Sequence, residues 1–178
     1  MPYEPMSDEK FEEMSRTFNQ KRYPRLNLAA ILQEIGVAPG KTVLDFGCGP
    51  GNFSIAASTL VTSSGLVYAL DIVPLAAKKI AAAAARKGLD NLRTITSGGS
   101  TGLDDDAVDV VLLFDILHHL EPPEPVLTEL ARVLAADGLL AVEDHHLEDD
   151  DLVARVEEGG PFSLSGRTDY AHLFSLVR

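Results

Sequence analysis

The sequence predicts a single α/β domain with a doubly wound, mainly parallel sheet of seven strands and helices on both faces. Two observations predict this fold. Short apolar runs alternate with helical patterns along most of the chain, and strands that alternate with helices form parallel sheets. One run, Val108–Phe114, is apolar almost throughout, as expected of a central parallel strand covered on both faces.

The elements divide the predicted domain, residues 1–178, into three parts. In residues 1–40, helical spacing from Asp8 to Ile35 with a break at Pro24 predicts two helices. Residues 41–146 form the core of alternating strands and helices, and residues 147–178 add a helix and two closing strands. The predicted elements of the last two parts are strand 42–46, helix 52–60, strand 66–70, helix 74–87, strand 91–96, strand 108–114, helix 125–134, turn 137–138, strand 139–143, helix 147–158, strand 162–164 and strand 170–177.

The composition excludes several classes of protein. Lys and Arg number 15 against 27 Asp and Glu, and the resulting net charge of -12 repels phosphate backbones and anionic membranes. We therefore expect neither nucleic acid nor a membrane as a partner. The segment Met1–Lys10 has no basic start and apolar run of the kind that an export signal needs. The one cysteine, Cys48, cannot form an intrachain disulfide, so we expect a cytoplasmic location.

The strongest motif is a glycine-rich loop between a strand and a helix. It reads Asp45-Phe46-Gly47-Cys48-Gly49-Pro50-Gly51. Glycines let a ligand approach the backbone, and the following helix offers unpaired N–H groups. The dinucleotide fingerprint requires a further glycine where Asn52 stands, which disfavours a nicotinamide-dependent oxidoreductase. The motif resembles motif I of class I S-adenosylmethionine-dependent methyltransferases.

This resemblance extends from about Val37 to Glu143 and implies methyl transfer from S-adenosylmethionine to a small-molecule acceptor. It also implies that residues 41–146 are the cofactor-binding core and that one strand of the sheet is reversed. It implies that Asp71, which ends the second strand, accepts hydrogen bonds from the ribose hydroxyls; the alternative is a helix cap before Pro74. The implied cofactor contacts are Asp45, Gly47, Cys48, Gly49, Gly51, Asn52, Asp71, Ile72, Gly98, Gly99 and Phe114.

The chain departs from this family after its third strand. Many members carry an acid there that contacts the adenine, whereas this chain reads Ser97-Gly98-Gly99-Ser100. A non-catalytic module that binds the cofactor therefore stays an alternative to an enzyme. Oligomeric state is open between monomer and homodimer. Between the two leading helices, Tyr23 and Arg25 are candidates to close over the cofactor, with surface packing as the alternative.

Asp115 and His118, after the fourth strand, are the candidate catalytic residues. We expect His118 to take a proton from the acceptor while Asp115 holds its ring. His119 is the competing candidate, because neighbours in a tight turn point in different directions and only one is expected to reach the pocket.

A second group of titratable residues, Glu143-Asp144-His145-His146, ends the fifth strand. A divalent metal shared with Asp115 and His118 is conceivable here, as is a general-base role for one of these histidines. Adjacent residues on a strand point in opposite directions, so we expect no metal.

Overall fold

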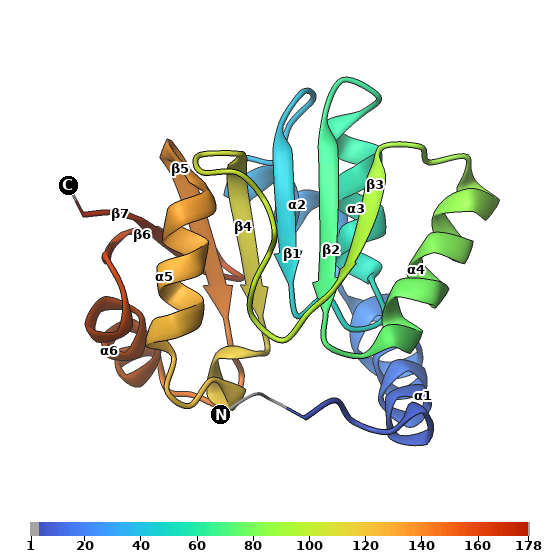
Figure 1. The fold of residues 1–178 in the computed structure, drawn as a ribbon, viewed down its shortest axis with the longest axis horizontal. Coiled ribbons are helices and arrows are strands. Elements are labelled where there is room, and N and C mark those ends of the chain that lie inside the picture. Colours follow the sequence, from blue (N-terminus) through green and yellow to red (C-terminus); the bar gives the residue numbers. More distant parts are fainter. Residues whose placement is uncertain (1–3, 178) are drawn as a thin grey trace.

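The seven strands lie in the order β3-β2-β1-β4-β5-β7-β6, as the computed structural model shows for residues 4–177 (Figure 1). β1 pairs in parallel with β2 and β4, and the pairs β2–β3 and β4–β5 are also parallel. Only β7 is reversed, because it runs antiparallel to both of its neighbours, β5 and β6. The predicted fold class is confirmed. The strands are β1 Thr42–Phe46, β2 Leu66–Asp71, β3 Leu92–Thr96, β4 Val108–Phe114, β5 Leu134–Glu143, β6 Phe162–Arg167 and β7 His172–Leu176.

Residues 1–3 and 178 lie outside the described part of the chain. The segment Met1–Lys10, in which the sequence predicts no export signal, therefore lies partly outside the described residues. Both ends of the predicted domain 1–178 lie outside them as well. The division of the chain after residues 40 and 146 stays a prediction. In residues 4–177, no helix is long and apolar enough to cross a membrane.

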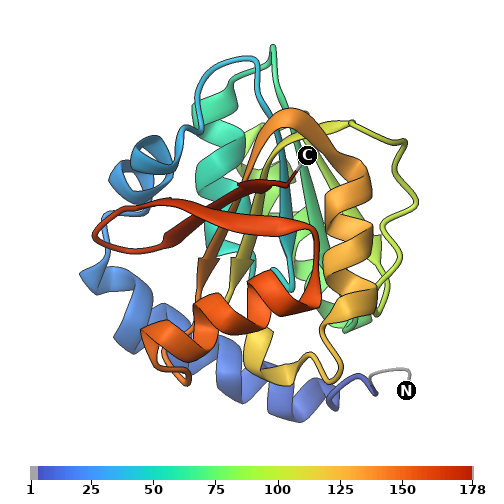
Figure 2. The same cartoon turned by 90° about the vertical axis from the view of Figure 1, so that its left-hand side faces the viewer.

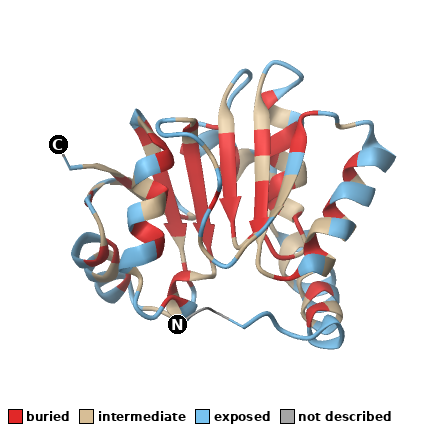
Figure 3. Cartoon of the chain, in the orientation of Figure 1, coloured by how far each residue is buried: buried red, intermediate tan, exposed pale blue. Residues whose placement is uncertain are grey.

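The helices pack two separate cores against the two faces of the sheet. Alternate residues of β1 point to opposite faces: Leu44 packs with α5 and α6, whereas Val43 packs with α2, α3 and α4. Figure 2 shows α2 and α3 on one side of the sheet and α5 on the other, and Figure 3 shows that the central strands are buried. The helices are α1 Asp8–Thr17, η1 Phe18–Arg22, η2 Tyr23–Arg25, α2 Leu28–Ile35, α3 Asn52–Val61, α4 Pro74–Lys87, η3 Leu117–His119, α5 Glu124–Val133 and α6 Asp149–Gly159.

The structure corrects the predicted turn at Asp137-Gly138, because both residues lie within β5. β5 starts directly after α5, and its register to β4 shifts between Val108 and Val110. At this irregularity the two backbones approach closely: a Cβ atom on Gly138 would lie 2.9 Å from the carbonyl oxygen of Asp109. Glycine is therefore needed here for close packing and not for a turn.

The N-terminal helices differ from a simple pair. The predicted break at Pro24 falls in η2, a 3₁₀ turn, and it follows η1, a turn of π-helix. α1 packs through Phe11 onto Val73 and Ala76 at the start of α4, and Lys79 pairs with Glu12 beside this contact. The first helix is thereby held beside the carboxyl ends of β1 and β2.

Candidate active site

A cavity of about 720 Å³ opens where β1, β2 and β4 end. Its volume lies in the range of small-molecule sites, and the carboxyl ends of parallel strands are where doubly wound sheets bind ligands. Met14 of α1 and Phe18 of η1 form part of its wall. Seven of the predicted cofactor contacts line this cavity: Gly47, Cys48, Gly49, Asp71, Ile72, Gly98 and Phe114.

The glycine loop is tied to the end of β2. The N–H groups of Gly47 and Cys48 donate to the carbonyl of Leu70 at 2.8 and 2.9 Å, and the Gly49 N–H donates to Asp71 Oδ2 at 2.8 Å. The other carboxylate oxygen, Oδ1, accepts from the Val73 N–H at 2.8 Å. Asp71 therefore both fixes the loop and caps the turn before α4, and its side chain also faces the cavity.

The glycines of this loop serve different purposes. A Cβ atom on Gly49 would meet only the Met14 methyl group, at 3.7 Å, so the loop is open to the cavity there. A Cβ atom on Gly47 would lie 2.8 Å from Ile116, and one on Gly51 would collide with Ile80. The latter two glycines let neighbouring elements pack closely.

Four predicted cofactor residues, Asp45, Gly51, Asn52 and Gly99, are absent from the cavity wall that the described residues form. Asp45 lies buried below the loop and accepts a hydrogen bond from Ser54. The Asn52 amide donates to Asn19 at 2.9 Å, which attaches α3 to η1. Any direct contact of these four residues with the cofactor stays a prediction.

Asp45 has an unusual electrostatic environment. Burial raises the pKa of its carboxyl to about 7, although the hydrogen bond from Ser54 opposes this rise. A charged carboxylate at this position would thus be costly to the fold.

At the far end of the cavity, the ends of β4 and β5 carry the candidate catalytic residues. Asp115 follows β4 with φ +56°, a conformation that Asp tolerates better than most residues, and its N–H donates to the carbonyl of Glu143 at 2.7 Å. His118 lies in η3 and lines the cavity. The two strand ends are therefore connected directly.

The carboxylate that contacts the His118 ring is Asp144, not Asp115 as we expected from the sequence. The Nδ1 atom of His118 lies 2.8 Å from Asp144 Oδ2, and the His118 N–H donates to the same oxygen at 2.9 Å. Asp115 instead contacts His145 and His146. The difference arises because η3 turns the His118 ring toward the end of β5.

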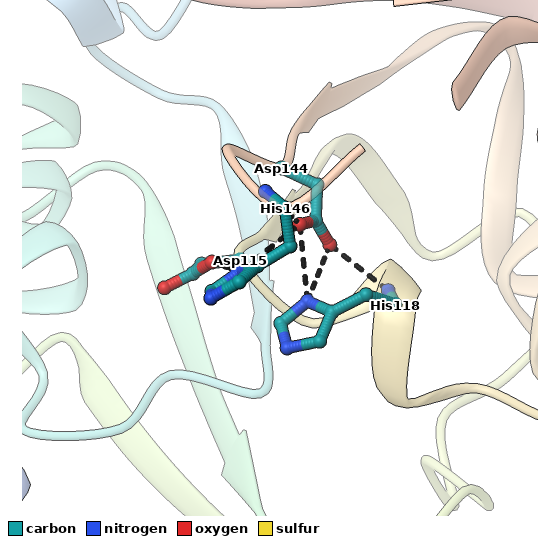
Figure 4. Close-up of side chains that lie close together, drawn as sticks. All are labelled: Asp115, His118, Asp144 and His146. Atoms are coloured by element: carbon teal, nitrogen blue, oxygen red, sulfur yellow. Dashed lines mark hydrogen bonds and ion pairs between the residues drawn. The ribbon is translucent and has the colours of Figure 1, made fainter. Parts of the chain in front are cut away.

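Four of the five histidines of the chain gather here. Ring centroids lie 3.9 Å apart for His119 and His118, 4.1 Å for His118 and His146, and 4.0 Å for His146 and His145. We expected only one of His118 and His119 to reach the pocket, but both line the cavity. We call Asp115, His118, Asp144 and His146 the Asp–His cluster (Figure 4).

Arg22 is a site residue that the sequence did not indicate. Its guanidinium contacts Asp115 Oδ2 and Glu143 Oε2, both at 2.8 Å, and so holds η1 against the ends of β4 and β5. Of the two residues considered from the sequence, Tyr23 lines the cavity and Arg25 is absent from the described wall. The π-helical turn, which no sequence pattern predicted, places Arg22 there.

Comparison with known proteins identifies a family. A family model described as a methyltransferase domain matches residues 38–166. An uncharacterized methyltransferase of Mycobacterium bovis is 33% identical over 103 residues, which are 58% of this chain and 39% of that protein. The chain thus spans about two fifths of the length of this relative.

Solved structures share the fold. A structure described as an S-adenosylmethionine-dependent methyltransferase from Aquifex aeolicus has a TM-score of 0.79 and 22% identity, with 96% of each chain covered. A [4+2]-cyclase, SpnF, has a TM-score of 0.67 and 18% identity over 78% of this chain and 57% of its own. Proteins named for different reactions therefore share this fold, which by itself does not fix the reaction.

Replacing Asp45 should change how stability depends on pH. The pKa of this carboxyl is ~3.9 in the unfolded chain and about 7 in the folded protein. The parent protein therefore loses stability as the pH rises from the first value to the second, because the unfolded chain ionises first. Asp45→Asn does not ionise, so its stability relative to the parent should increase over this pH range. The increase should reach a few kcal/mol, because each unit of pKa difference corresponds to ~1.4 kcal/mol. Denaturant unfolding from pH 4 to 8.5 measures this difference, with the exposed Asp137→Asn as a control. If the difference in free energy of unfolding between Asp45→Asn and the parent does not vary with pH, the pKa of Asp45 is not raised by folding.

Proposed function

Because the chain belongs to the methyltransferase-domain family, we propose that it transfers the methyl group of S-adenosylmethionine to a small-molecule acceptor. S-adenosylmethionine is the cofactor that membership of this family implies. One observation carries the proposal: a single cavity joins the open glycine loop at one end to a group of histidines and carboxylates at the other. Such a cavity can hold a cofactor and an acceptor side by side.

The residues of the cavity fit this cofactor. The open backbone at Gly49 forms a cradle that a side chain would fill, and the Asp71 carboxylate beside it can accept hydrogen bonds from hydroxyl groups. Ile72 and Gly98 line the wall at the ends of β2 and β3, where the adenine ring would rest without the usual acid. Phe114 ends β4 between this part of the cavity and the Asp–His cluster.

When bound, the cofactor supplies a methyl group on a positively charged sulfur, which is electrophilic without further activation. The chain must then align the acceptor with this methyl group and, for an oxygen or nitrogen acceptor, assist the loss of its proton. Asp115 and His118, the candidate catalytic residues, line the same end of the cavity. We therefore propose that the Asp–His cluster activates the acceptor atom.

Several features support a small acceptor in a cytoplasmic setting. The net charge of -12 disfavours nucleic acid, and Cys48, the one cysteine, is buried and free. The acceptor shares a cavity of about 720 Å³ with the cofactor, which leaves space for a compact molecule. A monomer or homodimer is consistent with this proposal.

Incubation with S-adenosylmethionine that carries an isotopically labelled methyl group, together with a mixture of small metabolites, tests the proposed function. Appearance of the label on a metabolite supports methyl transfer. Tight cofactor binding without any transfer would instead favour the alternative, a non-catalytic binding module.

Gly49→Val should abolish cofactor binding while the protein still folds. The valine side chain would enter the open space beside the loop, and its backbone strain at φ +50° costs about 1–3 kcal/mol. Gly88→Val is the matched control: Gly88 has φ +66° and open surroundings but ends α4 away from the cavity. Calorimetric titration with S-adenosylmethionine should detect binding in the control only. Equal affinity in the two variants would exclude the loop as the cofactor cradle.

Asp71→Asn should weaken the affinity for S-adenosylmethionine by about 1.5–3 kcal/mol, the usual value of hydrogen bonds to a charged group. Since Asp71 also holds the Gly49 and Val73 N–H groups, some stability is lost as well. Asp109→Asn controls for this loss, because Asp109 accepts the Thr42 N–H at 2.7 Å at the opposite end of the sheet. If both variants lose stability and neither loses affinity, Asp71 has only a structural role.

His118→Ala should lower the rate of methyl transfer by about 10²–10⁴-fold and leave cofactor affinity nearly unchanged, since it removes a group that acts on the acceptor. The matched control is His172→Ala, which removes the one histidine outside the group at the cavity. Turnover and cofactor affinity are measured separately once an acceptor is known. Full turnover in His118→Ala would show that the acceptor is activated elsewhere.

A further inference from the structure

We propose that the Asp–His cluster binds one divalent transition-metal ion, such as Zn²⁺ or Mn²⁺. This reverses the expectation of no metal drawn from the sequence. That expectation rested on adjacent residues of a strand pointing in opposite directions. Asp144 and His146, however, are two residues apart and not adjacent, and the chain has left β5 at Glu143 and turns at residues 145 and 146. Both side chains therefore lie beside Asp115 and His118, which follow β4 (Figure 4).

The four side chains converge in the way that a shared ion requires. One ligand atom from each of the four lies within 4.8 Å of all the others. His118 Nδ1 lies 2.8 and 3.0 Å from the two Asp144 oxygens, and His146 Nδ1 lies 3.1 Å from Asp115 Oδ1 and 3.5 Å from Asp144 Oδ1. Ligand atoms about 2.0–2.2 Å from one ion lie about 3.0–4.4 Å apart, so the spacings of 3.0, 3.1 and 3.5 Å suit a shared ion. The widest pairs, which lie within 4.8 Å, would close slightly when an ion binds.

Separate hydrogen-bonded pairs would explain the short distances but not the convergence. The hydrogen bond between His118 and Asp144 does not require the pair His146 and Asp115 to lie nearby, and the reverse is also true. Instead, His146 Nδ1 faces carboxylate oxygens of both Asp115 and Asp144. A single cation among the two imidazoles and two carboxylates accounts for these contacts together. His145 Nδ1, which lies 2.8 Å from Asp115 Oδ1, contacts the same carboxylate from outside this group.

Surrounding groups hold the carboxylates in place, as the hydrogen-bonding neighbours of metal ligands do. The Asp144 side chain is fully buried, and its two oxygens accept the backbone N–H groups of His118 and His146 at 2.9 and 3.1 Å. Arg22 binds Asp115 through Oδ2 and leaves Oδ1 directed at the histidines. Two carboxylates balance the charge of a divalent ion, and the histidines bind it as neutral imidazoles.

The ligand types indicate which ions fit. Two imidazole nitrogens and two carboxylate oxygens suit Zn²⁺, Mn²⁺ or similar transition metals, whereas Mg²⁺ and Ca²⁺ prefer oxygen ligands alone. Asp115, His118 and His146 also line the cavity, so a further coordination position would face an acceptor. An ion there would polarise an acceptor oxygen or nitrogen and ease the loss of its proton. This role rests on the proposed function, whereas binding of the ion does not.

Metal binding is measured on the untagged protein after dialysis against a chelator. Titration calorimetry with Zn²⁺ and with Mn²⁺, in the absence of cofactor, should show one ion per chain, and each bound ion should raise the melting temperature. His118→Gln and His146→Gln should each bind the ion at least tenfold more weakly. His119→Gln, which alters a ring stacked 3.9 Å from His118 but outside the Asp–His cluster, should bind it as the parent does.

The proposal fails if the parent binds neither ion, in which case the Asp–His contacts are hydrogen-bonded pairs. It also fails if the His118, His146 and His119 variants all bind equally, since the ion then lies elsewhere. The assay contains no S-adenosylmethionine, so an ion bound by a protein that transfers no methyl group would contradict the proposed function alone. Methyl transfer by a protein that binds no ion would contradict the metal site alone.

Discussion

The site depends on the parallel pairing of β1 with β2 on one side and with β4 on the other. In this register Phe46 lies opposite Leu70, and Asp45 lies opposite Leu112, so the three strands end at one edge of the sheet. The glycine loop, the Asp71 carboxylate and the segment after Phe114 therefore come from distant parts of the sequence and meet around one cavity. Burial of both sheet faces makes a slip in this register costly.

We propose one end of the cavity for the cofactor and the other for the acceptor, and different groups line these two ends. At the cofactor end, backbone groups and the absence of side chains define the shape, and the Asp71 carboxylate fixes the loop through the Gly49 N–H. At the acceptor end, histidine rings and carboxylates define the chemistry. Arg22 connects this end to η1, so the N-terminal helices form part of the wall that separates the cavity from solvent.

The fold and the position of the glycine loop between β1 and α3 were largely predictable because they depend on local patterns. Apolar runs locate the strands, and glycine spacing locates the loop. The register shift at Gly138, the π-helical turn that ends at Arg22 and the pairing of His118 with Asp144 were not predictable. Each depends on how segments more than twenty residues apart pack together, and a single sequence does not record such contacts. The convergence of Asp144 and His146 with Asp115 and His118 likewise depends on contacts between the segments that follow β4 and β5.

A crystal structure with S-adenosylhomocysteine, the product that methyl transfer leaves, tests the central claim most directly. We expect the ribose hydroxyls to contact Asp71 and the amino-acid part of the ligand to pass over Gly49. We also expect the sulfur to face the end of the cavity that holds Asp115 and His118. A ligand bound outside this cavity, or one whose sulfur points away from the Asp–His cluster, would contradict it.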